Sequence, residues 1–394
     1  MSNAVASLPY FPQGDSMATV RKRKLPSGMV RWQAGYKDGA GKRRFKLFEK
    51  KAEAEAWLVE ARHDVARGTH TPGSISPTVK DAAALWIKRC GEKRLEPMTV
   101  KGYEEHVDLH IVPFIGARKL SEITVPAVNA FADQLREKGR SAEMIKRVVR
   151  SLGSIFKEAR RRGLANTSPT SGIELDLPDR EDPRPVIPSK AELQAIISAA
   201  AGRWRPVILV AIFCGLRASE LRGLRWADVD FEAKQLNLTQ RADASHRIGK
   251  LKSRAAYRSI PCPPIVINTL REWKLVCPKR DTGKKDTAGK PVEVLELAFP
   301  NGLGKVESHS NVLERGLEPI LKAAGIDKGK YGMHSLRHAC ASLWIENGHN
   351  PKQIQRLMGH SSIKVTFDVY GHLFADAEAD QRAAETLQNR LLGV

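Results

Sequence analysis

Residues 357–374 read Leu-Met-Gly-His-Ser-Ser-Ile-Lys-Val-Thr-Phe-Asp-Val-Tyr-Gly-His-Leu-Phe, and they carry a Gly-His pair followed ten positions later by a tyrosine. A single tyrosine is most often a packing residue, so Tyr370 acquires a functional meaning only from what accompanies it. Upstream, His334-Ser-Leu-Arg-His338 opens an expected helix. His334 and Arg337 are three residues apart and therefore share one helix face.

Two further pieces lie earlier in the chain. Cys214-Gly-Leu-Arg-Ala-Ser-Glu-Leu-Arg222 places Arg217 near a break between two helices, where a guanidinium can bind a phosphate through two parallel hydrogen bonds. Residues 250–261, Lys-Leu-Lys-Ser-Arg-Ala-Ala-Tyr-Arg-Ser-Ile-Pro, are a basic hairpin followed by a strand, which can present a lysine to a leaving oxygen. Taken singly, each piece is more often a surface arginine, a solvated turn or a structural histidine. Their order and spacing carry the interpretation.

That order resembles the tyrosine recombinases, and specifically the phage-type integrases. The family shows an arginine in a G-L-R-x-x-E-L box, a hairpin lysine, an H-x-L-R-H box, a Gly-His pair and a terminal tyrosine. This chain matches every box in the same order, by motif over about residues 190–374. The helical region before it fits the family's core-site-binding domain, and the N-terminal strands and helix resemble its arm-site-binding domain.

The resemblance implies that DNA strands are cleaved and rejoined through a 3′-phosphotyrosyl intermediate. Negative charge grows on the nonbridging phosphate oxygens in the transition state, and two arginines aimed at them would stabilise it. A phenol with an unperturbed pKa of about 10 needs help to lose its proton, and the leaving 5′-oxygen needs a general acid. The residues that match the family's catalytic set are Arg217, Lys252, His334, Arg337, His360 and Tyr370.

The resemblance also implies a role for each residue. Tyr370 is the expected nucleophile, because it is the only tyrosine downstream of both histidine boxes. His334 is the candidate base or hydrogen-bond acceptor, and His360 is expected to hydrogen-bond the scissile phosphate. The strand after the hairpin favours Lys252 as the general acid, with Lys250 as the alternative.

Neither a cofactor nor a metal is expected. The covalent bond retains the phosphodiester energy, so the resemblance implies no ATP. The sequence has no nucleotide-binding loop and no carboxylate cluster suited to two metals. The His334 box lacks the H-E-x-x-H pattern of a zinc site. Glu220 is expected to brace Arg217 rather than to react.

The composition limits the function classes. The 394 residues have a net charge of +21, which favours polyanion partners, and their 42% hydrophobic fraction is that of a folded chain. The longest apolar stretch, Val207–Leu216, is about half of the ~20 residues that a membrane helix needs, and no secretory signal is apparent. Five widely spaced cysteines without a C-x-x-C favour a reducing compartment. A cytoplasmic, nucleoid-associated protein is therefore expected.

The expected fold class is a multidomain, mainly α protein with small β elements. Residues 1–16 are interpreted as a disordered lead-in and 17–72 as an arm-type DNA-binding domain of three strands and a helix. Residues 78–165 are interpreted as an α-helical core-site-binding domain. Residues 166–188, rich in proline and acidic residues, are interpreted as a linker. Residues 189–394 form the expected α+β catalytic domain with a C-terminal tail helix.

Hydrophobic periodicity sets the expected elements within these domains. Alternate residues from Val30 to Tyr36 are apolar, as in a half-buried strand, and the segment 21–51 holds twelve basic and two acidic residues. A solvated basic face and a sheet laid against DNA both fit this segment. Helices are expected at 50–67, 79–89, 99–111, 126–138 and 142–162, and strands at 235–239 and 257–260.

The resemblance implies several partners. They are double-stranded DNA, with core and arm sites, three further copies of the chain in a tetramer on DNA, a host DNA-bending protein and an excisionase. Residues 375–394 are an expected amphipathic helix. This helix either packs on its own domain or, as we favour, docks on a neighbouring protomer.

The implied function is a site-specific recombinase that integrates and excises a mobile element such as a viral genome. A type IB topoisomerase is the nearest rival, but the basic N-terminal unit and the spacing from Gly-His to tyrosine argue against it. A chromosome-dimer resolvase usually lacks the extra N-terminal domain. A catalytically idle DNA-binding regulator would need neither a tyrosine nor a lysine beside two arginines.

Overall fold

The computed structural model describes residues 19–38, 41–66, 76–178, 185–287, 289–374, 386 and 388–392. The expected lead-in and most of the expected tail helix lie outside these residues, although the backbone is helical at 386 and 388–392. The chain folds into two compact units, Met1–Glu181 and Asp182–Val394, which divide within the expected linker. Among the described residues, no helix is both long enough and apolar enough to cross a bilayer.

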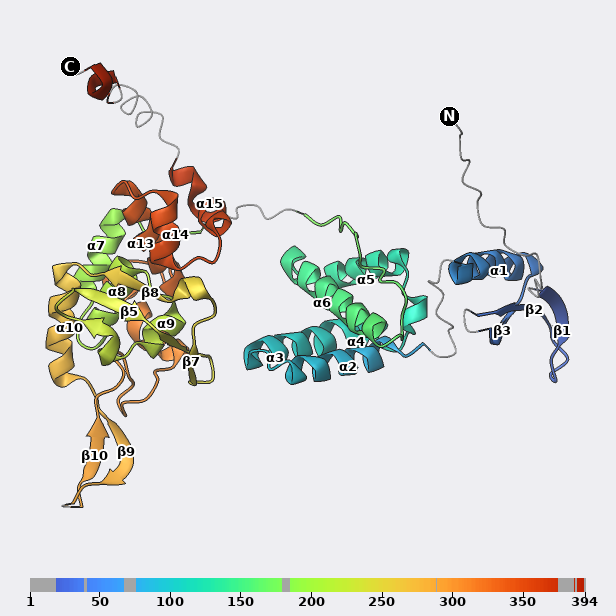
Figure 1. Cartoon of the computed structure of the whole chain (residues 1–394), viewed down its shortest axis with the longest axis horizontal. Coiled ribbons are helices and arrows are strands. Elements are labelled where there is room, and N and C mark those ends of the chain that lie inside the picture. The colour runs from blue at the N-terminus through green and yellow to red at the C-terminus, as the bar shows by residue number, and fades with distance from the viewer. Residues whose placement is uncertain are drawn as a thin grey trace, which may run out of the picture. The chain divides into compact units, whose positions relative to one another are not determined.

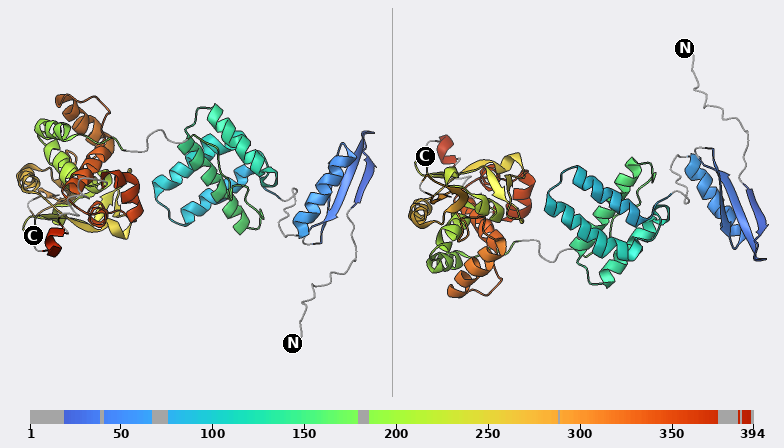
Figure 2. Two further views of the ribbon diagram at one scale, coloured as in Figure 1. Left: turned by 90° about the horizontal axis from the view of Figure 1, so that it is seen from above. Right: turned by 90° about the horizontal axis from the view of Figure 1, so that it is seen from below.

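The first unit begins with an antiparallel sheet in the order β1-β2-β3, covered by a helix (Figures 1 and 2). One sheet face packs on the helix through Ala34 and Tyr36, which are buried with Ala54 and Leu58. Side chains alternate across a sheet, so neighbouring positions face away from the helix. The elements are β1 (Thr19–Lys24), β2 (Val30–Lys37), β3 (Arg43–Phe48) and α1 (Lys51–Ala66).

The sheet face opposite α1 is basic. Arg23 lies opposite Arg31 in the register of β1 and β2, and Lys37 lies opposite Arg43 in that of β2 and β3. Phe45 on the same face is 54% exposed. Cations around an exposed aromatic ring give this face the chemistry of a nucleic-acid surface.

The rest of the first unit is a helical cluster with its own core. Its longest helix buries Val148, Leu152 and Phe156 on one side and leaves the basic side in solvent. The elements are α2 (Val79–Glu92), α3 (Pro97–His106), α4 (Val112–Ile115), α5 (Val125–Glu137) and α6 (Ala142–Arg161).

Two details of this cluster differ from the sequence interpretation. The expected single helix over 99–111 continues instead through a π-helical turn at Val107–Ile111 into α4. Residues 166–178, interpreted as linker, lie against the cluster, because Ile173, Leu175 and Leu177 pack on its core. Apolar residues at alternate positions explain this contact, since an extended segment can bury one side.

The second unit holds most of the remaining helices and three small sheets (Figure 1). Its strands are β4 (Val229–Asp230), β5 (Gln235–Leu238), β6 (Gln240–Ala242), β7 (Ile248–Lys250), β8 (Arg258–Pro261), β9 (Arg280–Lys285) and β10 (Pro291–Val294). Its helices are α7 (Lys190–Ala199), α8 (Trp204–Cys214), α9 (Ala218–Gly223), α10 (Pro264–Val276), α11 (His309–Asn311), α12 (Glu318–Ala323), α13 (Met333–Glu346), α14 (Pro351–Met358) and α15 (Ile363–Tyr370).

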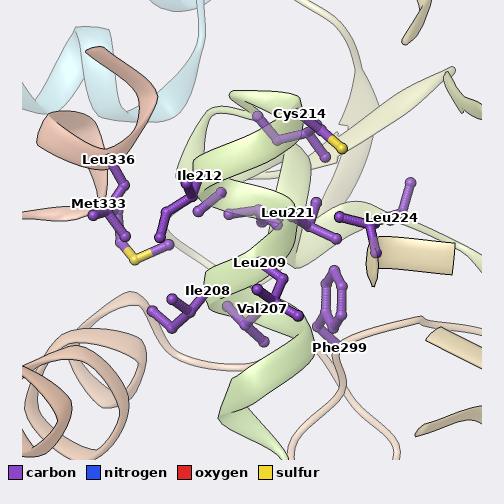
Figure 3. Close-up of a cluster of buried hydrophobic side chains, with 14 of the residues drawn as sticks. Val207, Ile208, Leu209, Ile212, Cys214, Leu221, Leu224, Phe299, Met333 and Leu336 are labelled. Carbon is purple, nitrogen blue, oxygen red and sulfur yellow. The ribbon is translucent and has the colours of Figure 1, made fainter. Parts of the chain in front are cut away.

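Helix α8 is the centre of the second unit. It is apolar on every side and is buried throughout most of its length. Figure 3 shows Met333 and Leu336 of α13 on one side of α8, and Leu221, Leu224 and Phe299 on the other. Helix α8, which leads into the box with Arg217, is thus packed on α13, which carries the box with His334 and Arg337.

The hairpin of β9 and β10 has no counterpart in the sequence interpretation. It projects from the second unit (Figure 1) and pairs antiparallel with a register shift between Pro291 and Glu293. The strands are short and polar, so the period-2 pattern that reveals a half-buried strand is weak here.

The core of the helical cluster can be tested by substitution. Leu152→Ala removes a side chain that is 0% exposed, and it should lower the free energy of unfolding of this cluster by about 2–5 kcal/mol. Leu109→Ala is the matched control, because that leucine is 59% exposed in the same cluster and should change stability by less than about 0.5 kcal/mol. Urea unfolding of the full chain measures both; equal effects would contradict the described core.

Candidate active site

The C-terminal end of α14 collects three arginines. Arg258 Nε donates to the carbonyl of Leu357 at 2.7 Å, and Arg217 Nη2 donates to the carbonyl of Gly359 at 2.9 Å. The carbonyl between these two, that of Met358, accepts from Arg337. The last carbonyls of a helix have no partner within the helix and carry partial negative charge, so this helix end is a natural anchor for cations.

Two glycines shape the anchor. Gly359 ends α14 at φ +64°, a left-handed conformation that glycine adopts without strain. A Cβ at Gly359 would also lie 2.7 Å from Arg258 Nη1. Gly215 ends α8 in the same way at φ +61°, and its carbonyl accepts from Arg337. The glycines of two sequence boxes therefore turn helix ends toward the arginines.

Glu220 is the buried counterion of this cluster. Its carboxylate accepts from Arg217 Nη1 at 2.8 Å and from Arg258 Nη2 at 3.0 Å. It also accepts from the Arg217 backbone N–H at 2.9 Å, which fixes the start of α9. Three guanidinium charges against one carboxylate leave the cluster with a surplus of two positive charges.

The pKa values follow from burial and this surplus. Burial and the nearby Arg217 lower the pKa of Arg337 to about 10. Burial alone would raise the pKa of Glu220, but Arg258 and then Arg217 and Arg337 outweigh it and hold that pKa at about 2. The site therefore carries cations that a bound phosphate would neutralise.

Tyr370 ends α15 and is 1% exposed, in a cluster with Ala341, Ile354 and Met358. Its hydroxyl lies 2.7 Å from Nδ1 of His338. Burial raises the pKa of the phenol, and the nearby Arg337 opposes that effect. The hydroxyl is protonated at neutral pH, so it donates to the imidazole.

Three histidines surround the arginines and the tyrosine. His360 is buried, with Nδ1 3.0 Å from Thr366 Oγ1. Burial and Arg337 lower the pKa of His360 to about 3, and burial, His334 and Arg337 lower that of His338 to about 4. Partial burial and the nearby Arg337 also lower the pKa of His334, although its side chain reaches solvent. All three rings are neutral at pH 7 and can accept a proton or a hydrogen bond.

The lysines stand apart from this group. Lys250 ends β7 and Lys252 follows it with an exposed side chain, after the turn of the β6–β7 hairpin rather than at its tip. No hydrogen bond or ion pair joins either lysine side chain to the other five candidates within the described ranges. The structure thus brings together Arg217, His334, Arg337, His360 and Tyr370.

Two residues of the site were not singled out from the sequence. Arg258 sits in the strand after the hairpin, and its only sequence signal is an arginine where a buried apolar residue is expected in a period-2 pattern. His338 closes the H-x-L-R-H box and was given no role. Its contact with Tyr370 joins α13 to α15, which no local pattern reveals.

A cleft of about 560 Å³ opens beside His360. Its lining combines an aromatic ring, cations and amides, and comes largely from the first two turns of α14 and the approach to β8. The residues are Ala255, Tyr257, Arg258, Asn350, Lys352, Gln353, Gln355, Arg356 and His360. Among the described residues, no group of three or more His, Cys, Asp or Glu side chains is arranged to hold a metal ion.

The Glu220 counterion predicts a pH dependence. A pKa held at about 2 in the folded state, against about 4.5 unfolded, gives stability that is present above pH 4.5 and lost as the pH falls toward 2. From pH 6 to pH 3 this carboxylate should account for about 2 kcal/mol of the loss.

The Glu220→Gln variant should therefore be less stable than wild type at pH 6 and should lose less stability on acidification. Urea unfolding of the full chain at both pH values measures the difference. Glu314→Gln, at an exposed carboxylate of the same unit, is the control and should follow wild type. Parallel pH curves for wild type and Glu220→Gln would contradict the assignment.

Three models of known families match the chain. They are the phage integrase family over residues 189–376, the phage integrase N-terminal domain over 21–67 and the phage integrase central domain over 79–174. A relative described as tyrosine recombinase XerC-like, from Caldanaerobacter subterraneus subsp. tengcongensis, is 27% identical over 361 residues, which span 86% of this chain and 90% of the relative.

Solved structures show the same fold. The Tn1549 transposon integrase in complex with transposon right end DNA matches with a TM-score of 0.64 at 21% identity, over 79% of this chain and 99% of that one. A lambda integrase tetramer bound to a Holliday junction matches with a TM-score of 0.54 at 18% identity, over 86% and 95%. These matches confirm the expected fold class. With family models matching 21–67, 79–174 and 189–376, the chain belongs to the tyrosine recombinases, within the phage integrase family.

Proposed function

We propose that the chain is a site-specific DNA recombinase that cleaves and rejoins strands through a 3′-phosphotyrosyl intermediate and so integrates and excises a mobile element. The observation that carries the proposal is the largely buried arginine cluster, with a surplus of two charges, near Tyr370. A phosphodiester is the anion that fits such a cluster, and the tyrosine hydroxyl beside it can act as a nucleophile.

Each residue of the catalytic set has a proposed role. Arg217 keeps 34% of its side chain exposed and binds a nonbridging oxygen, while the buried Arg337 supplies charge from behind. The Thr366 hydroxyl can donate to Nδ1 of His360, which leaves the Nε2–H of that ring as a donor to the phosphate. Lys252 donates a proton to the leaving 5′-oxygen, and the exposed hairpin segment allows it to approach bound DNA.

DNA on either side of the scissile phosphate would meet the cleft beside His360. Lys352 and Arg356 line this cleft and would bind flanking phosphates, contacts that position a duplex without reading its sequence. Tyr257 offers a ring face to a sugar or base. The basic sheet face opposite α1 would bind a second, arm-type DNA site.

The relatives support the partners. The similar solved structures include an integrase with transposon DNA and a tetramer on a Holliday junction, and we propose that this chain likewise assembles as a tetramer on double-stranded DNA. A host DNA-bending protein and an excisionase are further proposed partners, and the bacterial cytoplasm, at the nucleoid, is the proposed location.

Recombination can be separated from simple relaxation. A supercoiled plasmid that carries the two attachment sites of the element should yield recombinant products with wild type. Tyr370→Phe should bind the same DNA with unchanged affinity and give no product, because the substitution removes only the attacking oxygen. Relaxation of plasmids that lack the sites, without recombinants, would favour a topoisomerase. Binding without either activity in wild type would favour a regulator.

The general acid can be identified by changing the leaving group. Lys252→Ala should slow cleavage of an ordinary substrate by about 10²–10⁴-fold. A substrate with sulfur in place of the bridging 5′-oxygen should restore most of the rate, because a thiolate leaves without a proton. Lys250→Ala is the matched control and should cleave both substrates like wild type. The reverse pattern would assign the acid to Lys250.

A further inference from the structure

The hydroxyl of Tyr370 and Nδ1 of His338 are 2.7 Å apart, and their ring centroids are 5.6 Å apart. This distance is that of a normal hydrogen bond between a hydroxyl and a ring nitrogen. From this geometry we infer that His338, rather than His334, accepts the phenolic proton when Tyr370 attacks the scissile phosphate. The inference rests on the proposed function, which makes Tyr370 the nucleophile.

The two histidines of the box differ in what they touch. His334 lies one helical turn before His338, with the two rings edge to face at 4.6 Å, and its ring reaches solvent. Among the described residues, no hydrogen bond joins His334 to Tyr370. A base must lie within hydrogen-bond reach of the proton that it removes, and of these two rings His338 meets that requirement.

The groups around His338 keep its imidazole neutral, so that the ring can accept a proton. The titratable groups near His338 and Tyr370 are His334, Arg337 and Cys340 on α13 and His360 after α14. Burial, and after it the nearby His334 and Arg337, lower the pKa of the His338 imidazole to about 4, so the ring is neutral at pH 7. The neutral ring receives the proton only as the phenol attacks, when the phosphate has partly neutralised the arginines.

The proton balance of the step is complete. The Tyr370 O–H proton moves to Nδ1 of His338, the phenolic oxygen forms a bond to phosphorus, and the bond from phosphorus to the 5′-oxygen breaks. The leaving oxygen takes a proton from Lys252. In rejoining, the 5′-hydroxyl returns its proton to the lysine, and the departing phenolate recovers its own from His338. The step needs neither an oxidant nor a reductant.

Helix α13 ties the base to the phosphate site. His338 follows Arg337 directly, and the guanidinium of Arg337 is held by the carbonyls of Gly215 and Met358. Tyr370 comes from α15 and is 1% exposed, and its hydroxyl is held against His338. The inferred base and a phosphate-binding arginine are therefore neighbours on one helix.

The experiment measures formation of the covalent adduct on a nicked suicide substrate under single-turnover conditions. Asparagine places its side-chain oxygen near the position of Nδ1, so His338→Asn keeps a hydrogen-bond acceptor but no base. We expect adduct formation about 10²-fold slower or more, DNA binding unchanged, and a rate that rises with pH as the phenol ionises unaided. His349→Asn is the control, because Nδ1 of that ring lies against the backbone carbonyl of Trp344 and, within the described ranges, has no hydrogen bond to Tyr370.

A second arm separates a base from a structural residue. A fluorinated tyrosine at position 370, whose phenol is more acidic, should restore most of the rate of His338→Asn and should help wild type far less. An unchanged rate in His338→Asn would overturn the inference, because the base would then be dispensable. A faster rate would also overturn it, because the hydrogen bond from Tyr370 to His338 would then hold the tyrosine back. A loss that the acidic phenol does not reduce would overturn it as well. Failure of the proposed function would give a different result: the covalent adduct would still form in Tyr370→Phe.

Discussion

The C-terminal end of α14 organises the active site. Three successive carbonyls, from Leu357 to Gly359, each accept from a different arginine, and the arginines come from three separate sequence boxes or strands. A helix end supplies fixed partial charges that need no reorganisation when a substrate binds. Arginines that are far apart in the sequence therefore form one compact set of cations around a single short helix.

Burying the guanidinium groups of Arg258 and Arg337, with Arg217 partly buried beside them, is costly unless each is hydrogen-bonded. Here the carbonyls and Glu220 satisfy most of the donors, but one carboxylate leaves two charges uncompensated. The apolar packing of α8 against α13 (Figure 3) holds the arrangement in place. Stability contributed by that core offsets the electrostatic repulsion, which a phosphodiester relieves on binding. The site is thus prepared for an anion before DNA arrives, and the histidines beside it are neutral at pH 7 and able to accept a proton.

Local sequence was sufficient to predict the fold class and several residues of the site. Each box is a short motif, so Arg217, Arg337 and Tyr370 could be named from their order, and the fold class was confirmed. The roles and the domain limits stay predictions. Arg258 and the contact of His338 with Tyr370 could not be named, because they depend on packing between distant elements. The π-helical turn before α4 and the β9–β10 hairpin were missed because their polar or continuous patterns lack the periodicity that marks an element.

The most direct test of this account is to find where DNA becomes attached. A suicide substrate nicked near the core site, labelled on the fragment that keeps the 3′-phosphate, is trapped with wild type. The adduct is then digested with protease and nuclease, and its peptides are identified by mass spectrometry. A nucleotide is expected on the peptide that contains Tyr370, joined through the 3′-phosphate. A nucleotide on a peptide with another tyrosine, or a linkage through a 5′-phosphate, would contradict it.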